Sequence, residues 1–210
     1  DKNVEITPFG IDIDFFNSRP NFRNGEIVIG TVKSLCKIYG LDVLIKAFKL
    51  VVDSNEEKEL RLLIVGEGRE KPRLVNLVHE LKIEDKVEFV GKTAPDKIPE
   101  YLNRMNIFAA LSIGDESFGV SVLEASSCEI PVVVSNAPGF KEIVRNEYSG
   151  IIVPRNNIHK AAEAISRLVN DNELGVFMGR NGRMIVQEKY DLKSNVERMK
   201  QVYYKAIHLG

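Results

Sequence analysis

The chain has no tryptophan, two cysteines and three histidines among its 210 residues. Cys36 and Cys128 lie far apart, and neither belongs to a C-x-x-C pair, which argues against a disulfide scaffold or a zinc ribbon. His79, His159 and His208 are just as dispersed, whereas metal-ligating histidines usually come in clusters. From these residues we expect no metal site and no bound cofactor.

An excess of charge is absent as well. Lys and Arg total 29 against 30 Asp and Glu, and a nucleic-acid-binding protein should carry a basic excess, so we expect no nucleic-acid partner. No apolar run approaches the ~20 residues that cross a membrane. The chain starts with Asp1 and shows no signal peptide, which suggests a piece of a longer protein. Because domains commonly hold ~100–200 residues, we expect residues 1–210 to form a single domain.

Two kinds of segment alternate along the chain. Short apolar runs rich in β-branched residues, typical of strands buried on both faces, occupy 27–32, 60–66, 86–91, 106–112, 130–135 and 149–154. Segments with helical spacing lie between them, at 41–52, 70–82 and 96–105, and helical periodicity without a strand runs from 158 to 208. This pattern predicts an α/β fold: a Rossmann-like, doubly wound parallel sheet of about six strands with a helical C-terminal tail.

The expected topology also predicts where a ligand binds. In open parallel sheets, ligands bind beyond the carboxyl ends of the strands. Functional residues are therefore expected in the loops 33–40, 66–70, 91–96 and 112–119, and in the turn after Ser135, which contains Pro138 and Gly139.

Two short motifs suggest chemistry that their surroundings do not favour. Gly66-Glu67-Gly68 stands between a predicted strand and a predicted helix, as in a dinucleotide-binding turn, but Lys71 occupies the place of the third glycine. We interpret the motif as a tight turn beside some ligand. Asp12 and Asp14 have the spacing of a metal-holding carboxylate pair, yet they precede the first predicted strand, and we interpret them as a polar turn.

The segment 116–135 carries the strongest signal. Glu116 and Glu124 are eight residues apart, and Glu124 is surrounded in sequence by small or apolar residues. Because buried carboxylates need a partner, Glu124 on a helix that begins near Gly119 is suited to accept hydrogen bonds from a diol such as ribose. The alternative is a structural role, with hydrogen bonds only to the backbone or to Ser127.

The start of this expected helix offers a second kind of contact. The amides of Phe118, Gly119 and Val120 would point at whatever occupies the cleft, and a helix N-terminus with free N–H groups is an anion site. Gly119 would let the backbone approach the ligand closely. Glu116 is expected on the loop just before the helix.

These motifs resemble those of the retaining glycosyltransferases of family 4. That family has the two-domain GT-B fold, and the resemblance, which runs over nearly the whole chain, is to its C-terminal, nucleotide-sugar-binding half. The similar pieces are, in order, Pro8-Phe9-Gly10-Ile11-Asp12, Leu62-x-Ile64-Val65-Gly66-Glu67-Gly68, Val87-x-Phe89-x-Gly91, Glu116-x-Phe118-Gly119, Leu123-Glu124-Ala125, Pro131-Val132-Val133, Gly139-x-x-Glu142 and Gly150-x-x-Val153-Pro154.

The resemblance implies roles for single residues. Glu116 would face the donor sugar and act in catalysis, and Glu124 would hold the ribose hydroxyls. The amides of Phe118, Gly119 and Val120 would lie near the diphosphate and the hexose.

The chain departs from the family's pattern at the two positions whose positive charges bind the diphosphate. Where the family usually has an arginine and a lysine, this chain has Ser34 and Tyr39. We expect Lys33, at the end of the first strand, to supply the catalytic positive charge from a shifted position, with Lys37 as a second donor-binding candidate.

The resemblance implies transfer of a sugar from a UDP- or GDP-linked donor to a hydroxyl acceptor with retention of configuration, in the synthesis of a cell-surface polysaccharide or glycolipid. The implied partners are the nucleotide-diphosphate sugar, an acceptor carbohydrate or lipid-linked sugar, and a missing N-terminal domain. Without that domain the fragment is expected to be inactive. The implied location is cytoplasmic, with peripheral membrane association at the inner face through the missing half. GT-B enzymes generally need no bound metal.

Two alternatives to this reading remain. One is a non-catalytic nucleotide-binding or interaction domain on the same scaffold. The other is a phosphorylase or sugar-phosphate synthase of the same two-domain architecture.

Overall fold

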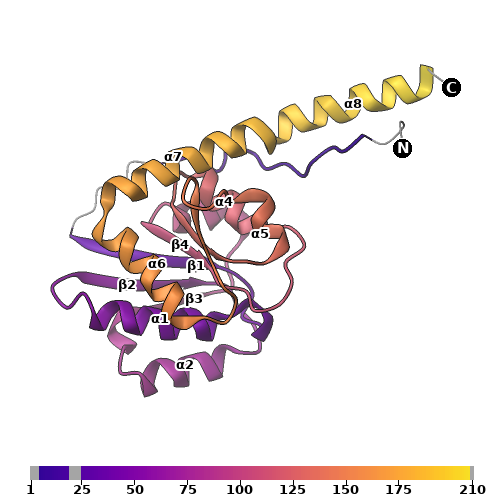
Figure 1. The fold of residues 1–210 in the computed structure, drawn as a ribbon. Helices are drawn as coiled ribbons and strands as arrows, with labels where there is room; N and C mark the ends of the chain where they lie inside the picture. Colours follow the sequence, from indigo (N-terminus) through magenta and orange to yellow (C-terminus); the bar gives the residue numbers. More distant parts are fainter. Residues whose placement is uncertain (1–4, 19–24, 209–210) are drawn as a thin grey trace.

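The structure is a computed structural model that describes residues 5–18 and 25–208. Its centre is one sheet of six parallel strands in the order β3-β2-β1-β4-β5-β6, which confirms the expected Rossmann-like, doubly wound fold (Figure 1). The strands are β1 (Glu26–Val32), β2 (Glu59–Val65), β3 (Val87–Gly91), β4 (Ile107–Ala110), β5 (Val132–Ser135) and β6 (Gly150–Val153).

Helices connect the strands and form the C-terminal part. They are α1 (Leu41–Asp53), α2 (Lys71–Glu80), α3 (Ile98–Leu102), α4 (Val120–Ser127), α5 (Pro138–Ile143), α6 (Ile158–Asn170), α7 (Asn172–Lys189) and α8 (Leu192–His208). Three short 3-10 turns also occur: η1 (Lys37–Tyr39), η2 (Glu84–Lys86) and η3 (Pro95–Lys97). Asp171 separates α6 from α7, and Tyr190–Asp191 separate α7 from α8. Among the described residues, no helix is long and apolar enough to cross a membrane.

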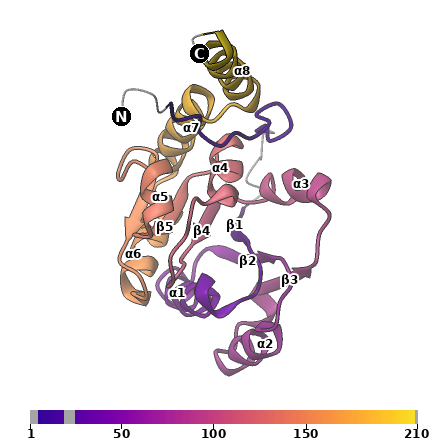
Figure 2. The same cartoon turned by 90° about the vertical axis from the view of Figure 1, so that its right-hand side faces the viewer.

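Helices cover both faces of the sheet (Figure 2). On one face α1, α2 and α6 bury their apolar stripes against the strands, in a cluster that includes Phe48, Ile64 and Ile165. On the other face α3, α4, α5 and the second half of α7 do the same around Phe108 and Phe140. Every residue of β4 and β5 is buried, which explains why these strands are apolar rather than alternating, except for Ser135 at the end of β5.

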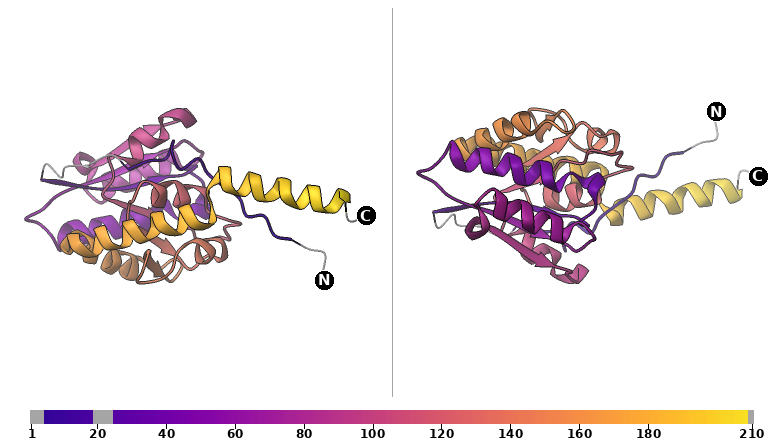
Figure 3. Two further views of the ribbon diagram at one scale, coloured as in Figure 1. Left: turned by 90° about the horizontal axis from the view of Figure 1, so that it is seen from above. Right: turned by 90° about the horizontal axis from the view of Figure 1, so that it is seen from below.

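The first described segment, residues 5–18, is hydrogen-bonded to the junction between α7 and α8. The amide of Ile11 donates to the carbonyl of Tyr190 over 2.9 Å, and the amide of Leu192 donates to the carbonyl of Ile11 over 3.0 Å. Gly10 permits this contact, because a Cβ there would lie 2.7 Å from Cα of Leu192. Beyond this point α8 and residues 5–9 extend together from the body of the domain (Figure 3).

One element differs from the sequence-based expectation. Pro138 and Gly139 do not form a simple turn after β5 but begin the helix α5. Proline suits this place because its missing N–H would have no intrahelical acceptor in the first turn. The Gly139-x-x-Glu142 motif therefore lies on a helix.

Candidate functional site

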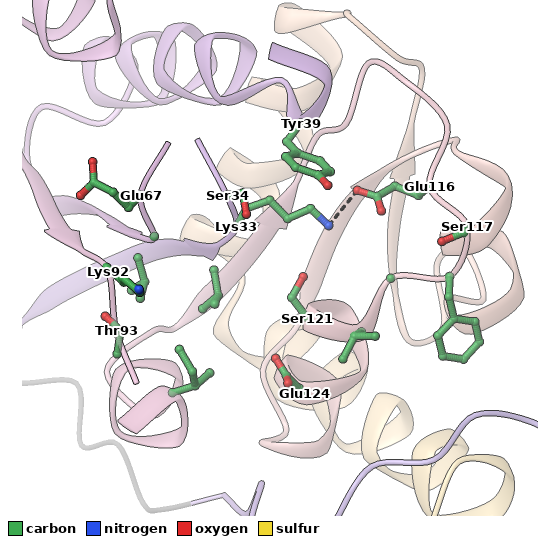
Figure 4. A pocket seen from close by; sticks show the side chains of 17 residues that line it. Lys33, Ser34, Tyr39, Glu67, Lys92, Thr93, Glu116, Ser117, Ser121 and Glu124 are labelled. Carbon is green, nitrogen blue, oxygen red and sulfur yellow. Dashed lines mark ion pairs between the residues drawn. The ribbon is translucent and has the colours of Figure 1, made fainter. Parts of the chain in front are cut away.

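The strand order creates a switch point between β1 and β4, the central neighbours from which the sheet continues in opposite directions. A cavity of about 600 Å³ lies beyond the carboxyl ends of the strands at this point, where such sheets bind ligands. All four loops predicted to carry functional residues contribute to it. Its lining is Val32, Lys33, Ser34, Tyr39, Val65, Gly66, Glu67, Lys92, Thr93, Ile98, Glu116, Ser117, Phe118, Gly119, Val120, Ser121 and Glu124 (Figure 4).

Lys33 and Glu116 form an ion pair across the switch point. The Lys33 Nζ atom lies 2.8 Å from Oε1 of Glu116, and the two side chains are only 16% and 9% exposed (Figure 4). The hydroxyl of Ser112 donates to the same carboxylate oxygen over 2.6 Å. The Lys33 ammonium also lies 4.5 Å from the ring centroid of Tyr39, within cation–π range. The pair therefore places one positive and one negative group, both largely shielded from solvent, on the wall of the cavity.

Two glycines hold the loop that carries Lys33. The amide of Lys33 donates to the carbonyl of Val65, and that of Leu35 donates to the carbonyl of Glu67. A Cβ on Gly66 would lie 2.0 Å from the Lys33 carbonyl oxygen, and one on Gly68 would lie 2.4 Å from that of Leu35. The Gly66-Glu67-Gly68 turn thus serves to bring the ends of β1 and β2 together beside the cavity.

The loop that carries Glu116 is supported from α5. The amide of Gly139 donates to the carbonyl of Glu116 over 3.1 Å, and a Cβ at Gly139 would lie 2.6 Å from the amide nitrogen of Phe118. The ring of Phe140 packs against Gly119, where a side chain would meet it at 2.7 Å. α5 therefore fixes the position of Glu116 and of the following backbone.

Helix α4 points its N-terminus at the cavity, as the sequence predicts. Gly119 is the N-cap residue with a φ of 109°, a conformation that favours glycine. The amides of Val120 and Ser121 have no hydrogen-bond acceptor within the part of the chain that the structure describes. Free N–H groups at the positive end of the helix dipole favour an anion.

Glu124 lies one turn along α4 and also lines the cavity. Burial raises the pKa of its carboxyl to about 7, and the charge of Lys33 opposes this effect. Ser127 is not its partner, because the Ser127 hydroxyl donates to the carbonyl of Phe16 over 2.6 Å. Within residues 5–18 and 25–208, no hydrogen bond or ion pair reaches the Glu124 carboxylate. The alternative that Glu124 has a structural role, bound to the backbone or to Ser127, therefore lacks the hydrogen bonds that it requires.

The remaining predicted site residues are placed as follows. Lys37 is exposed on η1 and does not line the cavity. Phe118 lines it and also packs edge-on against Phe9 and Tyr190, with ring centroids 5.4 and 5.7 Å apart. Lys92, which directly follows β3, is a cavity cation that the sequence reasoning did not single out. Its only signal was its place in the loop 91–96.

The Asp12–Asp14 motif is a polar turn, as expected. Oδ1 of Asp12 accepts the amides of Asp14 and Phe15 over 3.0 Å each, and Oδ2 of Asp14 pairs with Lys193. No group of three or more His, Cys, Asp or Glu residues in the described ranges is arranged to hold a metal ion.

Comparison with known proteins gives a match to one family model. The model described as "Glycosyl transferases group 1" matches residues 12–184. A similar curated protein is N-acetyl-alpha-D-glucosaminyl L-malate synthase of Bacillus anthracis, 29% identical over 199 residues, which cover 95% of this chain and 51% of that protein. The chain thus spans about half the length of the curated relatives it matches.

Two solved structures have a similar fold. The Anabaena protein HepE in complex with UDP and glucose has a TM-score of 0.82 at 22% identity, over 93% of this chain and 55% of that chain. The C-terminal domain of LpcC, a glycosyl transferase group 1 family protein of Francisella tularensis, has a TM-score of 0.76 at 22% identity, over 87% of this chain and all of that domain.

Proposed function

The chain belongs to the glycosyl transferases group 1 family, and we propose that it is the donor-binding half of an enzyme that transfers a sugar from a nucleotide-diphosphate sugar to a hydroxyl acceptor. Transfer would proceed with retention of configuration. The observation that carries the proposal is the cavity at the switch point, where the ammonium of Lys33 and the open N-terminus of α4 are both available to an anion.

In this function Lys33 and the α4 amides stabilise the departing diphosphate. Negative charge grows on the leaving group as the sugar–phosphate bond breaks, and preorganised positive groups in a shielded site are effective in stabilising such charge. Lys33 is well shielded, with 16% of its side chain exposed. Its ammonium pairs with one oxygen of Glu116 and contacts the Tyr39 ring, and because an ammonium has three N–H donors it can also donate to a phosphate oxygen.

The two glutamates have separate roles. Glu116 orients the donor sugar, because Lys33 and Ser112 hold its carboxylate in place on the wall of the cavity. Glu124 binds the ribose hydroxyls, since its carboxylate lacks a protein partner within the described residues and a diol would supply two donors. Ligand donors would also favour its ionised form.

The wider context of the reaction is part of the same proposal. The donor is UDP- or GDP-linked, and UDP is the nucleotide in the similar HepE structure. The acceptor is a carbohydrate or lipid-linked sugar, bound by an N-terminal domain outside this chain, in the synthesis of a cell-surface polysaccharide or glycolipid. The enzyme would work in the cytoplasm, at the inner face of the membrane.

Calorimetry on the 210-residue chain tests the donor site. UDP and GDP are titrated in parallel with uridine and guanosine, into the wild type, Lys33→Ala and Lys37→Ala. A charge-assisted hydrogen bond contributes about 1.5–3 kcal/mol, so Lys33→Ala should weaken binding of the preferred diphosphate by about tenfold or more. The same variant should leave binding of the matching nucleoside nearly unchanged.

Lys37→Ala is the matched comparison, because Lys37 lies on the same loop but outside the cavity lining. A larger loss in Lys37→Ala than in Lys33→Ala would transfer the diphosphate contact to Lys37. A wild-type chain that binds neither diphosphate would contradict the proposed function itself.

A further inference from the structure

The hydroxyl of Ser121 is buried without a hydrogen-bond partner. The residue is only 9% exposed, and its Oγ atom has no acceptor or donor within the part of the chain that the structure describes. Three other buried serines, Ser112, Ser127 and Ser135, each donate a hydrogen bond of 2.6–2.7 Å. Because buried hydroxyls are nearly always paired, an unpaired one suggests that its partner is a ligand.

The position of Ser121 agrees with this. It is the second residue of α4, in the turn whose amides are free, and it lines the cavity. Its hydroxyl points from α4 into the space that Lys33 borders on the opposite side, while Glu124 lies further along the helix (Figure 4). A small polar side chain here therefore faces the same volume as the ammonium and the helix N-terminus.

We propose that Ser121 is a ligand-binding residue whose hydroxyl donates a hydrogen bond to a phosphate oxygen of the bound nucleoside diphosphate. This role rests on the proposed function, which supplies the ligand. The Val120 and Ser121 amides and the Lys33 ammonium line the same cavity and are donors. Of the two carboxylates in the cavity, that of Glu116 is already paired with Lys33 and Ser112, and that of Glu124 lies one turn further along α4. A phosphate is therefore the expected acceptor for the Ser121 hydroxyl. Several donors that converge on one volume favour an anion with several acceptor oxygens.

An unpaired hydroxyl also has a consequence for the ligand-free chain. Leaving a buried polar group unsatisfied destabilises the folded state, whereas a hydroxyl with a protein partner stabilises it. Removing the Ser121 hydroxyl should therefore raise the melting temperature of the free chain and weaken ligand binding. A serine with a structural role would show the opposite: lower stability and unchanged binding.

Ser127 provides the matched control, because it is buried on the same helix and its hydroxyl is paired with the carbonyl of Phe16. Ser121→Ala, Ser127→Ala and the wild type are compared by calorimetry with UDP, GDP and their nucleosides, and by thermal unfolding without ligand. For Ser121→Ala we expect about tenfold weaker diphosphate binding, nucleoside binding within about twofold of wild type, and a melting temperature about 2–4 °C higher. For Ser127→Ala we expect a lower melting temperature and unchanged binding.

Two results would overturn the role of Ser121. One is diphosphate binding by Ser121→Ala as tight as that of the wild type, and the other is an equal loss for nucleoside and diphosphate. If Lys33→Ala weakens diphosphate binding while Ser121→Ala does not, the proposed function stands and only the Ser121 contact is wrong. If the wild type binds neither diphosphate, both fail together.

Discussion

Glu124 should make the stability of the free chain fall as pH rises. Burial raises the pKa of its carboxyl to about 7 in the folded chain, against the ordinary value of 4.5 in the unfolded chain. Between these values the folded chain holds a proton that the unfolded chain has released. The free energy of unfolding decreases with pH wherever the folded state binds more protons, so this group destabilises the fold above pH 4.5 and increasingly up to neutral pH.

The size of the effect follows from the two pKa values. A difference between 4.5 and about 7 corresponds to about 3 kcal/mol once the pH is well above 7. Because part of this loss has already occurred at lower pH, about 2 kcal/mol of it falls between pH 5.5 and 8.5. That is a large share of the stability of an ordinary domain, which is about 5–15 kcal/mol.

Urea unfolding of the wild type and Glu124→Gln at pH 5.5 and 8.5 measures this contribution. Glutamine stays neutral at both values, so the difference between the two proteins isolates Glu124 from all other titrating groups. We expect Glu124→Gln to gain about 2 kcal/mol relative to the wild type on going from the lower to the higher pH. Glu188→Gln, at an exposed position on α7, is the control and should track the wild type. An identical wild-type-to-Gln difference at both pH values would show that the Glu124 carboxyl titrates normally, and the reasoning from burial would be wrong.

Two further predictions concern the architecture around the cavity. Gly66→Ala should destabilise the chain by about 2 kcal/mol or more in urea unfolding, because its Cβ would lie 2.0 Å from the Lys33 carbonyl oxygen at a φ of 140°. Gly25→Ala has a similarly positive φ of 90° but open space around it, so an equal loss in both variants would rule out the steric explanation. Asn157→Ala should cost about 1 kcal/mol, because the Asn157 side chain accepts the amide of Lys160 at the start of α6. Asn157→Asp, which keeps the acceptor, should unfold like the wild type; if it loses as much as the alanine variant, the cap is not the cause.

Much of the fold could be predicted because the strands are buried on both faces. Runs such as 130–135 are apolar without alternation, and the sheet places the strand within one or two residues of them. α5 was missed for a specific reason. Gly139 reads as a turn residue, whereas its function is to let the backbone at Phe118 come within contact distance. Both a tight turn and the close approach of two backbone segments favour glycine, so the sequence alone does not show which of the two Gly139 serves.

The sequence predicts which loops line the candidate site, but it does not predict which side chains in those loops contact one another. The rule that ligands bind beyond the carboxyl ends of parallel strands leads to the loops that carry Lys33 and Glu116, whereas Glu124 is indicated by the small and apolar residues around it in the sequence. The ion pair between Lys33 and Glu116 depends on β1 lying beside β4, which is a property of strand order. The raised pKa of Glu124 and the unpaired hydroxyl of Ser121 depend on burial by segments distant in the sequence. The small and apolar residues around Glu124 indicate its burial, but the sequence carries no local sign of the unpaired Ser121 hydroxyl.

The pairing of Ile11 with the segment around Asp191 has a consequence for biosynthesis. Ile11 and Phe16 belong to the buried cluster on the α4 face of the sheet, yet the backbone partners of Ile11 are Tyr190 and Leu192. During synthesis on the ribosome, Ile11 can form these hydrogen bonds only after Tyr190 and Leu192 have emerged, by which time nearly the whole domain has been made. Contacts of such long sequence separation close late and slowly, and apolar surface stays exposed until they do. The chain should therefore depend on its last helices to complete a core that its first residues begin.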